Sequence, residues 1–225
     1  MSLALTRLLQ LASPALPVGA FSYSQGLEWA IEEGAVNDPD SACRWIHDTL
    51  HFSIGRFEAP LWLRLYSSWQ NRDGEQASHW NALLYRTRES MEFRGETAQM
   101  GYSLLRLFRE TEAFGAEVME RFEQLTPITF TAAFSCAAAQ WQIPREDGLL
   151  GYLWSWLENQ VAVTMKTLPL GQVAGQRMLN AVGATLPALL EQAMKLPDDS
   201  LGCVTSALAI ASSRHETQYC RLFRS

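Results

Sequence analysis

The sequence predicts an all-α protein, a single domain spanning residues 1–225 and built as a bundle of roughly nine to eleven helices around a buried central one. Apolar residues recur every three or four positions along almost the whole chain, whereas runs that alternate apolar and polar residues are scarce. Hydrophobic residues make up 48% of the 225 and charged residues 19%, which is enough apolar surface for one substantial core. No repeat, low-complexity stretch or linker interrupts this pattern.

The helical pattern of the first half falls into stretches separated by prolines, glycines and polar turns. We expect helices over residues 3–12, 24–33, 39–55, 60–69, 75–88, 96–109 and 113–125. Ser24 is placed to cap the second stretch and Asp38 the third, where Pro39 takes the first helical position. Gly55 should end that helix, and Pro60 should open the next.

In the second half the expected helices are more deeply buried. Residues 129–141 are rich in alanine, so neighbouring helices can approach them closely. Residues 144–168 carry apolar side chains around the whole helix axis, which predicts the central helix. Residues 172–195 continue as a helix that Pro187 should kink. From Asp199 onward an apolar stripe predicts a last helix that runs almost to the end: Leu201, Val204, Leu208, Ala211, His215, Tyr219 and Leu222.

Charge and composition argue against several function classes. The net charge of −6 and the pI near 5.3 disfavour nucleic acid or an anionic membrane as the main partner. No stretch reaches the roughly 20 apolar residues that a membrane helix needs. The four cysteines lie far apart without a C-x-x-C pair, which fits a reducing compartment better than a disulfide scaffold. We therefore expect a soluble, cytoplasmic protein.

Catalytic motifs are scarce. The segment HDTLH, His47 to His51, resembles the zinc-protease pattern H-E-x-x-H, in which two histidines on one helical face bind the metal. Asp48 is one methylene shorter than the glutamate base and no third ligand is evident nearby, so a zinc-dependent hydrolase is the weaker alternative. The chain has neither a phosphate-binding G-x-x-x-x-G-K-[ST] loop nor a G-x-S-x-G nucleophile turn. We expect no enzymatic activity, and no metal ligand can be assigned.

The tail SSRHETQYCRLFRS, residues 212–225, has the composition of a protein interface. Its three arginines oppose one acidic residue, and Tyr219 and Leu222 add aromatic and aliphatic surface. Two interpretations remain open, because the tail either docks on a partner or packs on the chain's own core. The same two interpretations hold for Phe21 and Tyr23, which lie in an opening loop that is unusually apolar for a loop.

Three long and distinctive motifs lie in order along nearly the whole chain. They are LLQLASPALPVGAFSYSQGLEWA (residues 8–30), YLWSWLENQVAVTMKTLPLGQVAGQRML (residues 152–179) and the tail SSRHETQYCRLFRS. In these motifs the chain resembles the UreF family of urease accessory proteins. Residues 70–124 match the family's pattern less well, and no residue is assigned a role there.

The resemblance implies an all-α, non-enzymatic adaptor or chaperone that forms a homodimer in the cytoplasm. Such a protein binds the accessory protein UreD, also called UreH, recruits the GTPase UreG and modulates it. The complex then delivers nickel into the metallocentre of apo-urease. No cofactor is implied for the chain itself, since nickel is handled by the complex and GTP is bound by the partner GTPase. A generic helical module that binds another protein remains the second alternative.

The matched motifs also suggest partner-binding residues. Tyr23 and Arg221 come first, because they match the family's end motifs with an aromatic and a planar anchor. Lys166 and Arg177, around PLGQVAGQR, are expected to face the GTPase. The full set of partner-binding candidates is Phe21, Tyr23, Lys166, Arg177, Arg214, His215, Glu216, Tyr219 and Arg221.

Overall fold

The computed structural model describes residues 3–202 and 205–225, and every regular element in this part of the chain is helical. The α-helices span Leu3–Leu11 (α1), Leu27–Glu32 (α2), Pro39–Thr49 (α3), Ala59–Gln70 (α4), Gly74–Arg86 (α5), Met91–Glu110 (α6), Ala116–Glu123 (α7), Phe130–Gln140 (α8), Arg145–Thr167 (α9), Gln172–Gly183 (α10), Leu186–Lys195 (α11) and Ser206–His215 (α12). Short 3₁₀ turns occupy Ala20–Ser22 (η1) and Asp198–Ser200 (η3), and a π-helical segment covers Leu50–Glu58 (η2). The predicted all-α class is confirmed.

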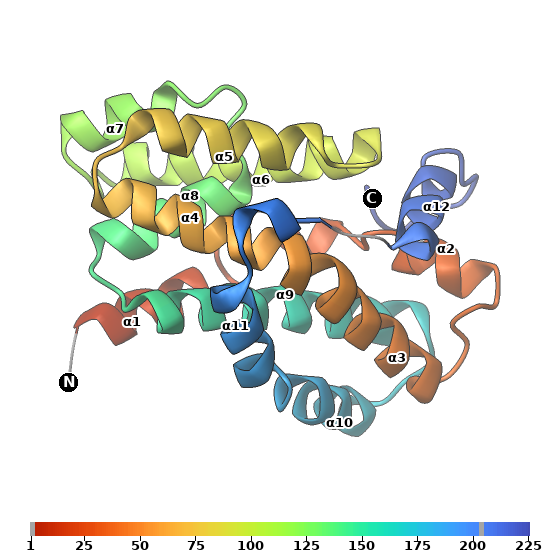
Figure 1. Cartoon of the computed structure of the whole chain (residues 1–225). Helices are drawn as coiled ribbons and strands as arrows, with labels where there is room; N and C mark the ends of the chain where they lie inside the picture. The colour runs from red at the N-terminus through yellow and green to blue at the C-terminus, as the bar shows by residue number, and fades with distance from the viewer. Residues whose placement is uncertain (1–2, 203–204) are drawn as a thin grey trace.

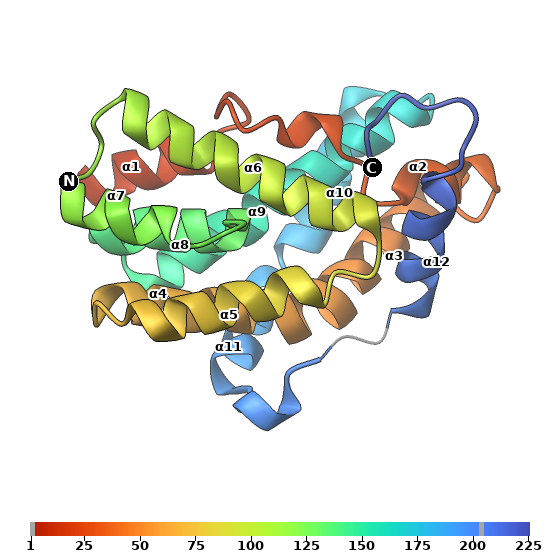
Figure 2. The ribbon, with the colours of Figure 1, turned by 90° about the horizontal axis from the view of Figure 1, so that it is seen from above.

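The helices pack in layers, and the last residues of the chain lie beside the loop between α1 and α2. Figure 1 shows α5, α6 and α7 above α4 and α8, with α9 beneath them and α2 and α12 together at one end. Seen from above in Figure 2, the last residues lie between α6 and α2, beside the opening loop. None of the helices within residues 3–202 and 205–225 is long and apolar enough to cross a membrane.

Two helices form the centre of the core. Helix α8 is buried along its whole length except for its first and last residues, and its small side chains let α4 and α6 pack closely against it. Helix α9, predicted as the central helix, contacts α1, α2, α3, α4, α8, α10 and α11. The main hydrophobic cluster includes side chains from Leu11 to Phe223, so both ends of the chain contribute to one core.

Helices α3 and α4 are joined through η2 into one continuous rod. The start agrees with the prediction, because the Asp38 carboxylate accepts the Ser41 backbone N–H at 2.7 Å and Pro39 follows it. The predicted end at Gly55 is wrong. Gly55 lies inside the π-helical segment, where a Cβ would come within 2.7 Å of the Leu189 side chain. Glycine at this position therefore permits close packing on α11 rather than ending a helix.

Three further boundaries differ from the sequence prediction. Ser24 does not cap a helix, because α2 starts at Leu27 and the Ser24 hydroxyl is buried without a hydrogen-bond partner. Helix α6 starts earlier than predicted, since Ser90 accepts the Phe93 N–H at 3.0 Å and caps it. Pro187 does not kink a long helix. It sits in the first turn of α11, after the chain has already broken from α10.

The last predicted helix is much shorter in the structure. Helix α12 ends at His215, and residues 216–225 continue as an irregular tail. Val204, which the predicted stripe included, lies outside the described residues. Tyr219, also in that stripe, is fully exposed at 103%. The predicted helix does not extend through these residues, because the backbone N–H groups of Leu222 and Phe223 donate to the Glu28 carboxylate on α2 and not to a preceding helical turn.

Candidate partner-binding site at the two ends of the chain

In the structure the first residues of the tail motif belong to α12, and only residues 216–225 form the irregular tail referred to from here on. This tail runs alongside the opening loop, residues 12–26, which joins α1 to α2. The backbone N–H of Arg224 donates to the Ser22 carbonyl at 2.7 Å. The Ser225 carbonyl accepts hydrogen bonds from the backbone N–H groups of Ser24 and of Gln25, the latter at 3.1 Å. The two motifs at opposite ends of the sequence therefore form one surface.

Glu28 of α2 is the main attachment point of the tail. Its carboxylate accepts the backbone N–H groups of Leu222 at 2.6 Å and Phe223 at 3.1 Å. The same carboxylate receives the Nε2 atom of His215 at 3.0 Å. Glu28 is only 6% exposed, so one buried charge organises the end of α12 and the tail together.

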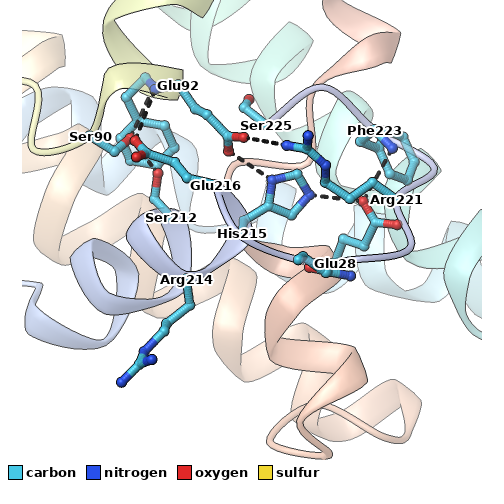
Figure 3. Close-up of polar contacts among 12 residues, drawn as sticks. Glu28, Ser90, Glu92, Ser212, Arg214, His215, Glu216, Arg221, Phe223 and Ser225 are labelled. Atoms are coloured by element: carbon cyan, nitrogen blue, oxygen red, sulfur yellow. Dashed lines mark hydrogen bonds and ion pairs between the residues drawn. The ribbon is translucent and has the colours of Figure 1, made fainter.

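His215 lies between two carboxylates and joins α2 to α6. Its Nδ1 atom is 2.7 Å from Glu92 on α6, and the other Glu92 oxygen accepts the Arg221 guanidinium at 2.8 Å (Figure 3). Each ring nitrogen of His215 therefore faces one carboxylate, and each pair is a salt bridge when the imidazole is protonated. His215 is fully buried, which makes this chain of alternating charges a structural element rather than exposed surface.

A second set of bonds fixes α12 against the start of α6. Glu216 accepts the Met91 backbone N–H at 2.7 Å, which places a negative charge at the N-terminus of that helix. The hydroxyls of Ser90 and Ser212 are 2.5 Å apart (Figure 3). Contacts from Glu216 and Ser212 thus anchor the helix from which the tail emerges.

Glu96, one turn along α6 from Glu92, reaches the last residue of the chain. Its carboxyl group accepts Gln25 Nε2 at 2.6 Å and the Ser225 hydroxyl at 3.0 Å. Burial raises the pKa of Glu96 to about 7, although the Gln25 hydrogen bond and the charge of Arg88 oppose that rise. This attachment is therefore sensitive to pH near neutrality.

The outer face of the tail and loop is apolar and basic. Leu222 is 73% exposed, Phe21 is 64% exposed and Tyr219 is fully exposed. The Lys166 ammonium, at the end of α9, lies 5.8 Å from the ring of Phe21 and 5.5 Å from that of Phe223. Exposed aromatic and aliphatic side chains beside cations are typical of surfaces that other proteins cover.

A cavity of about 300 Å³ is lined by the opening loop, α6 and α9. Its wall is mostly apolar but includes Glu58, which accepts Arg88 Nη2 at 2.5 Å and the Tyr152 hydroxyl. Burial raises the pKa of Tyr152 well above its usual value, so this hydroxyl stays protonated and donates. Among the described residues, no group of three or more histidine, cysteine or acidic side chains is arranged to hold a metal ion.

Several known proteins match this chain along its length. The UreF family profile matches residues 36–183. A urease accessory protein UreF from Azoarcus sp. is 52% identical over 225 residues, which cover 99% of this chain and 96% of that protein. The chain belongs to the UreF family. A UreF from Methylobacillus flagellatus is 48% identical over 224 residues, which cover 100% of this chain and 99% of that protein.

One relative combines a UreF-like part with further sequence. A bifunctional urease accessory protein UreEF from Bordetella bronchiseptica is 48% identical over 224 residues. The match covers 98% of this chain but 52% of that protein. Within the UreF family, the region matched here therefore also occurs as part of a longer accessory protein.

The structure brings most of the sequence-derived candidates to this surface, but in two different environments. Phe21, Lys166, Tyr219 and Arg221 lie on the outside, where the Arg221 side chain is 39% exposed. Arg214 is also exposed and points away from the charged network in Figure 3. Arg177 is exposed on α10, and no hydrogen bond or ion pair joins it to this group within the described residues. Their role in partner binding stays a prediction.

Tyr23 and His215 are in the interior, so neither presents its side chain to solvent. Tyr23 is 6% exposed and belongs to the main core, which is one of the two interpretations that the sequence left open. Burial and the charge of Glu96 raise its pKa. Any effect of these two residues on a partner must therefore pass through the position of the loop and tail that they hold.

Sequence reasoning missed the acidic side of the network. Glu28, Glu92 and Glu96 anchor the tail, yet none was a candidate. Glu92 and Glu96 are four residues apart and therefore lie on one face of α6. Two carboxylates at this spacing repel each other unless hydrogen-bond donors from another segment face them. That spacing was the available signal, but it lies in the stretch where the family motifs are weakest.

Proposed function

We propose that this chain is a non-enzymatic adaptor in the nickel loading of urease. It binds UreD (UreH), recruits the GTPase UreG, and as a homodimer in the cytoplasm promotes GTP-dependent insertion of nickel into apo-urease. Nickel is handled by the assembled complex and GTP is bound by UreG, so the adaptor requires no cofactor of its own.

Membership of the UreF family supports this role. The main structural support is the exposed surface that the opening loop and the tail form together. Opening loop and tail are held in a defined shape by buried carboxylates, while Phe21, Tyr219 and Leu222 remain exposed. Ordering this surface before binding lowers the entropy cost of association. The fusion named UreEF supports joint action with other accessory proteins.

Such an adaptor works by binding one conformation of its partners more tightly than another. A partner shifts the equilibrium of a GTPase only by its differential affinity for the two states. The exposed cations Lys166 and Arg177 are the candidates for contact with the nucleotide-binding partner. The surface modulates UreG by stabilising the nucleotide state of UreG that it binds more tightly.

Co-purification tests the proposal. The purified chain is mixed with UreD and UreG, with and without GTP and nickel, and the complexes are separated by size-exclusion chromatography. We expect a stable complex with UreD that takes up UreG. A chain that binds neither protein under any of the four conditions would contradict the proposed function.

A further inference from the structure

Gln25, in the opening loop, has a backbone conformation that its place between helices does not explain. Four non-glycine residues in the described part of the chain have a positive φ angle: Gln25, Arg72, Glu112 and Gln142. The last three each follow the C-cap residue of α4, α6 or α8, where a left-handed residue commonly ends a helix. Gln25, with φ at 54°, follows no α-helix. Contacts other than a helix end therefore hold its backbone in this conformation.

The side chain of Gln25 makes such contacts. Its Oε1 atom accepts the indole N–H of Trp156, on α9, at 2.7 Å. Its Nε2 atom donates to Oε1 of Glu96, on α6, at 2.6 Å. Because an indole N–H can only donate, the amide oxygen faces Trp156 and the amide nitrogen faces Glu96. The amide of Gln25 thus joins α9 to α6 in one orientation.

Gln25 also closes a ring of hydrogen bonds with the tail. Its backbone N–H donates to the Ser225 carbonyl at 3.1 Å, and the Ser225 hydroxyl donates to the second oxygen of Glu96 at 3.0 Å. Together with the bond from Gln25 Nε2 to Glu96, these bonds join the opening loop, α6 and the tail. The adjacent Gly26 lets the loop pack on α12, since a Cβ there would come within 2.9 Å of the Ser212 backbone nitrogen. The loop and the tail are therefore fixed to each other at Gln25.

We propose that Gln25 is the positioning residue of the partner-binding surface, and that accessory proteins bind tightly only when its side chain holds the opening loop and the tail together. The amide is bonded on both sides within the chain, so Gln25 acts through exposed residues of the loop and tail such as Phe21 and Leu222. Two segments that are already fixed lose less conformational entropy when a partner covers them. This inference rests on the proposed function, because it concerns the affinity for the accessory partners.

Substitution by asparagine separates the side-chain bonds of Gln25 from its backbone conformation. Asparagine adopts a positive φ more readily than glutamine, but it is one methylene shorter and cannot reach both Trp156 and Glu96. Gln142→Asn is the matched control, because Gln142 has φ at 52° and is exposed after α8. We expect Gln25→Asn to weaken binding to UreD and UreG by at least about tenfold, and Gln142→Asn to leave it unchanged. Isothermal titration calorimetry measures these affinities.

A reciprocal exchange tests the pairing of Gln25 with Glu96. At about pH 8 the side chain introduced by Gln25→Glu is ionised and cannot donate to Glu96, so binding should again fall at least about tenfold. In Gln25→Glu/Glu96→Gln the carboxylate at position 25 can accept both the Trp156 indole N–H and the amide at position 96. We expect this double variant to recover an affinity within about threefold of the wild type. A side chain that only fills space would not be rescued by the exchange.

Hydrogen exchange in the absence of partners reports directly on the loop and the tail. The backbone N–H of Ser24 donates to the Ser225 carbonyl, and that of Arg224 donates to the Ser22 carbonyl. Both amides should exchange faster in Gln25→Asn than in the wild type, whereas amides within α8 should exchange equally in the two proteins. Urea unfolding followed by circular dichroism establishes that the variants are folded.

Three outcomes would overturn the proposal. They are wild-type affinity in Gln25→Asn, an equal loss of affinity in Gln142→Asn, and no recovery in the folded double variant. Should Gln25→Asn fail to fold, the comparison of Gln25→Glu with the double variant decides. If the wild-type chain itself binds neither UreD nor UreG, the proposed function fails and this inference fails with it. Failure of the inference alone leaves wild-type binding intact, so the two failures are distinguishable.

Discussion

The Glu28 carboxylate accepts hydrogen bonds from two backbone groups of the tail and from His215, and it is nearly inaccessible to solvent. Replacing it by glutamine removes one of the two carboxylates that face His215 and weakens both backbone bonds. We expect Glu28→Gln to lower the free energy of unfolding by about 3 kcal/mol. Urea titration followed by circular dichroism measures this loss.

Glu33 provides the matched control, because it ends the same helix but is exposed. Glu33→Gln should change the free energy of unfolding by less than about 0.5 kcal/mol. If the two substitutions lowered the free energy of unfolding equally, the loss would come from the net charge of α2 and not from the contacts of Glu28 with the tail.

Glu96 makes stability depend on pH. Its pKa is raised in the folded chain to about 7 from 4.5. The folded state thus binds this proton more tightly than the unfolded state, and the contribution is fully present below pH 4.5 and lost as pH rises through 7. Glu96→Gln cannot ionise, so relative to the wild type it should gain up to about 3 kcal/mol over that interval.

Urea titrations of wild type and Glu96→Gln at a series of pH values measure this difference. The unfolding free energy of Glu96→Gln minus that of the wild type should increase between pH 4.5 and 7. If this difference stayed constant or decreased over that interval, Glu96 would not be neutral beneath the tail.

At the scale of residues the sequence predicted the basic half of the network but not the acidic half. Arginine and tyrosine in the tail are conspicuous against an acidic chain, so composition alone selects them. A glutamate in a helix has no such signature, and the contact between Glu92 and Arg221 joins positions 129 apart in the sequence. Only the fold reveals that Glu28 and Glu92 share His215.

Helix α6 passes close to the backbone that leads into α8. Gly101 of α6 lies against backbone, and a Cβ there would come within 2.7 Å of the Thr129 carbonyl carbon. Backbone cannot move aside as a flexible side chain can, so Gly101→Ala should destabilise the protein by about 3 kcal/mol. Chemical denaturation measures the effect.

The same helix supplies the control, because Gly95 is exposed and a Cβ there meets nothing within 4 Å. Gly95→Ala should stabilise the protein by about 0.5–1 kcal/mol through its helix propensity. If Gly101→Ala were as harmless as Gly95→Ala, the close approach of α6 to residues 128–129 would be wrong.

Elements were predictable where local chemistry decides them. The Asp38–Pro39 start of α3 and the extent of α8 and α9 follow from capping, proline and apolar periodicity, and all three agree with the structure. Gly55 and residues 216–225 were misjudged for a common reason. Leu189 packs on Gly55, and Glu28 binds the tail backbone, so in both places a distant partner overrides the local pattern.

Across the whole molecule, the opening loop and the tail together form one exposed surface, which is the proposed binding site for the accessory partners. Tyr219 and Leu222 make up part of this surface without supporting the core through their own side chains. Tyr219→Ala and Leu222→Ala should therefore leave the unfolding free energy within about 0.5 kcal/mol of the wild type. Because these side chains are proposed as interface anchors, each substitution should weaken binding to the accessory partners by about 2 kcal/mol.

Tyr102→Ala is the control for these substitutions. Tyr102 is 53% exposed on α6, about 16 Å along the helix from Met91, the residue that Glu216 contacts. The variant removes the same aromatic side chain from a surface to which no partner is assigned. We expect it to bind UreD and UreG as the wild type does.

Urease activation measures most directly whether the surface formed by the opening loop and the tail is needed by the accessory partners. Apo-urease is incubated with UreD, UreG, GTP, nickel and either the wild-type chain, a Tyr219→Ala/Leu222→Ala double variant, or Tyr102→Ala, and urease activity is then assayed. We expect full activation by the wild type and by Tyr102→Ala, and little by the folded double variant. Full activation by the double variant would contradict a role of this surface in partner binding.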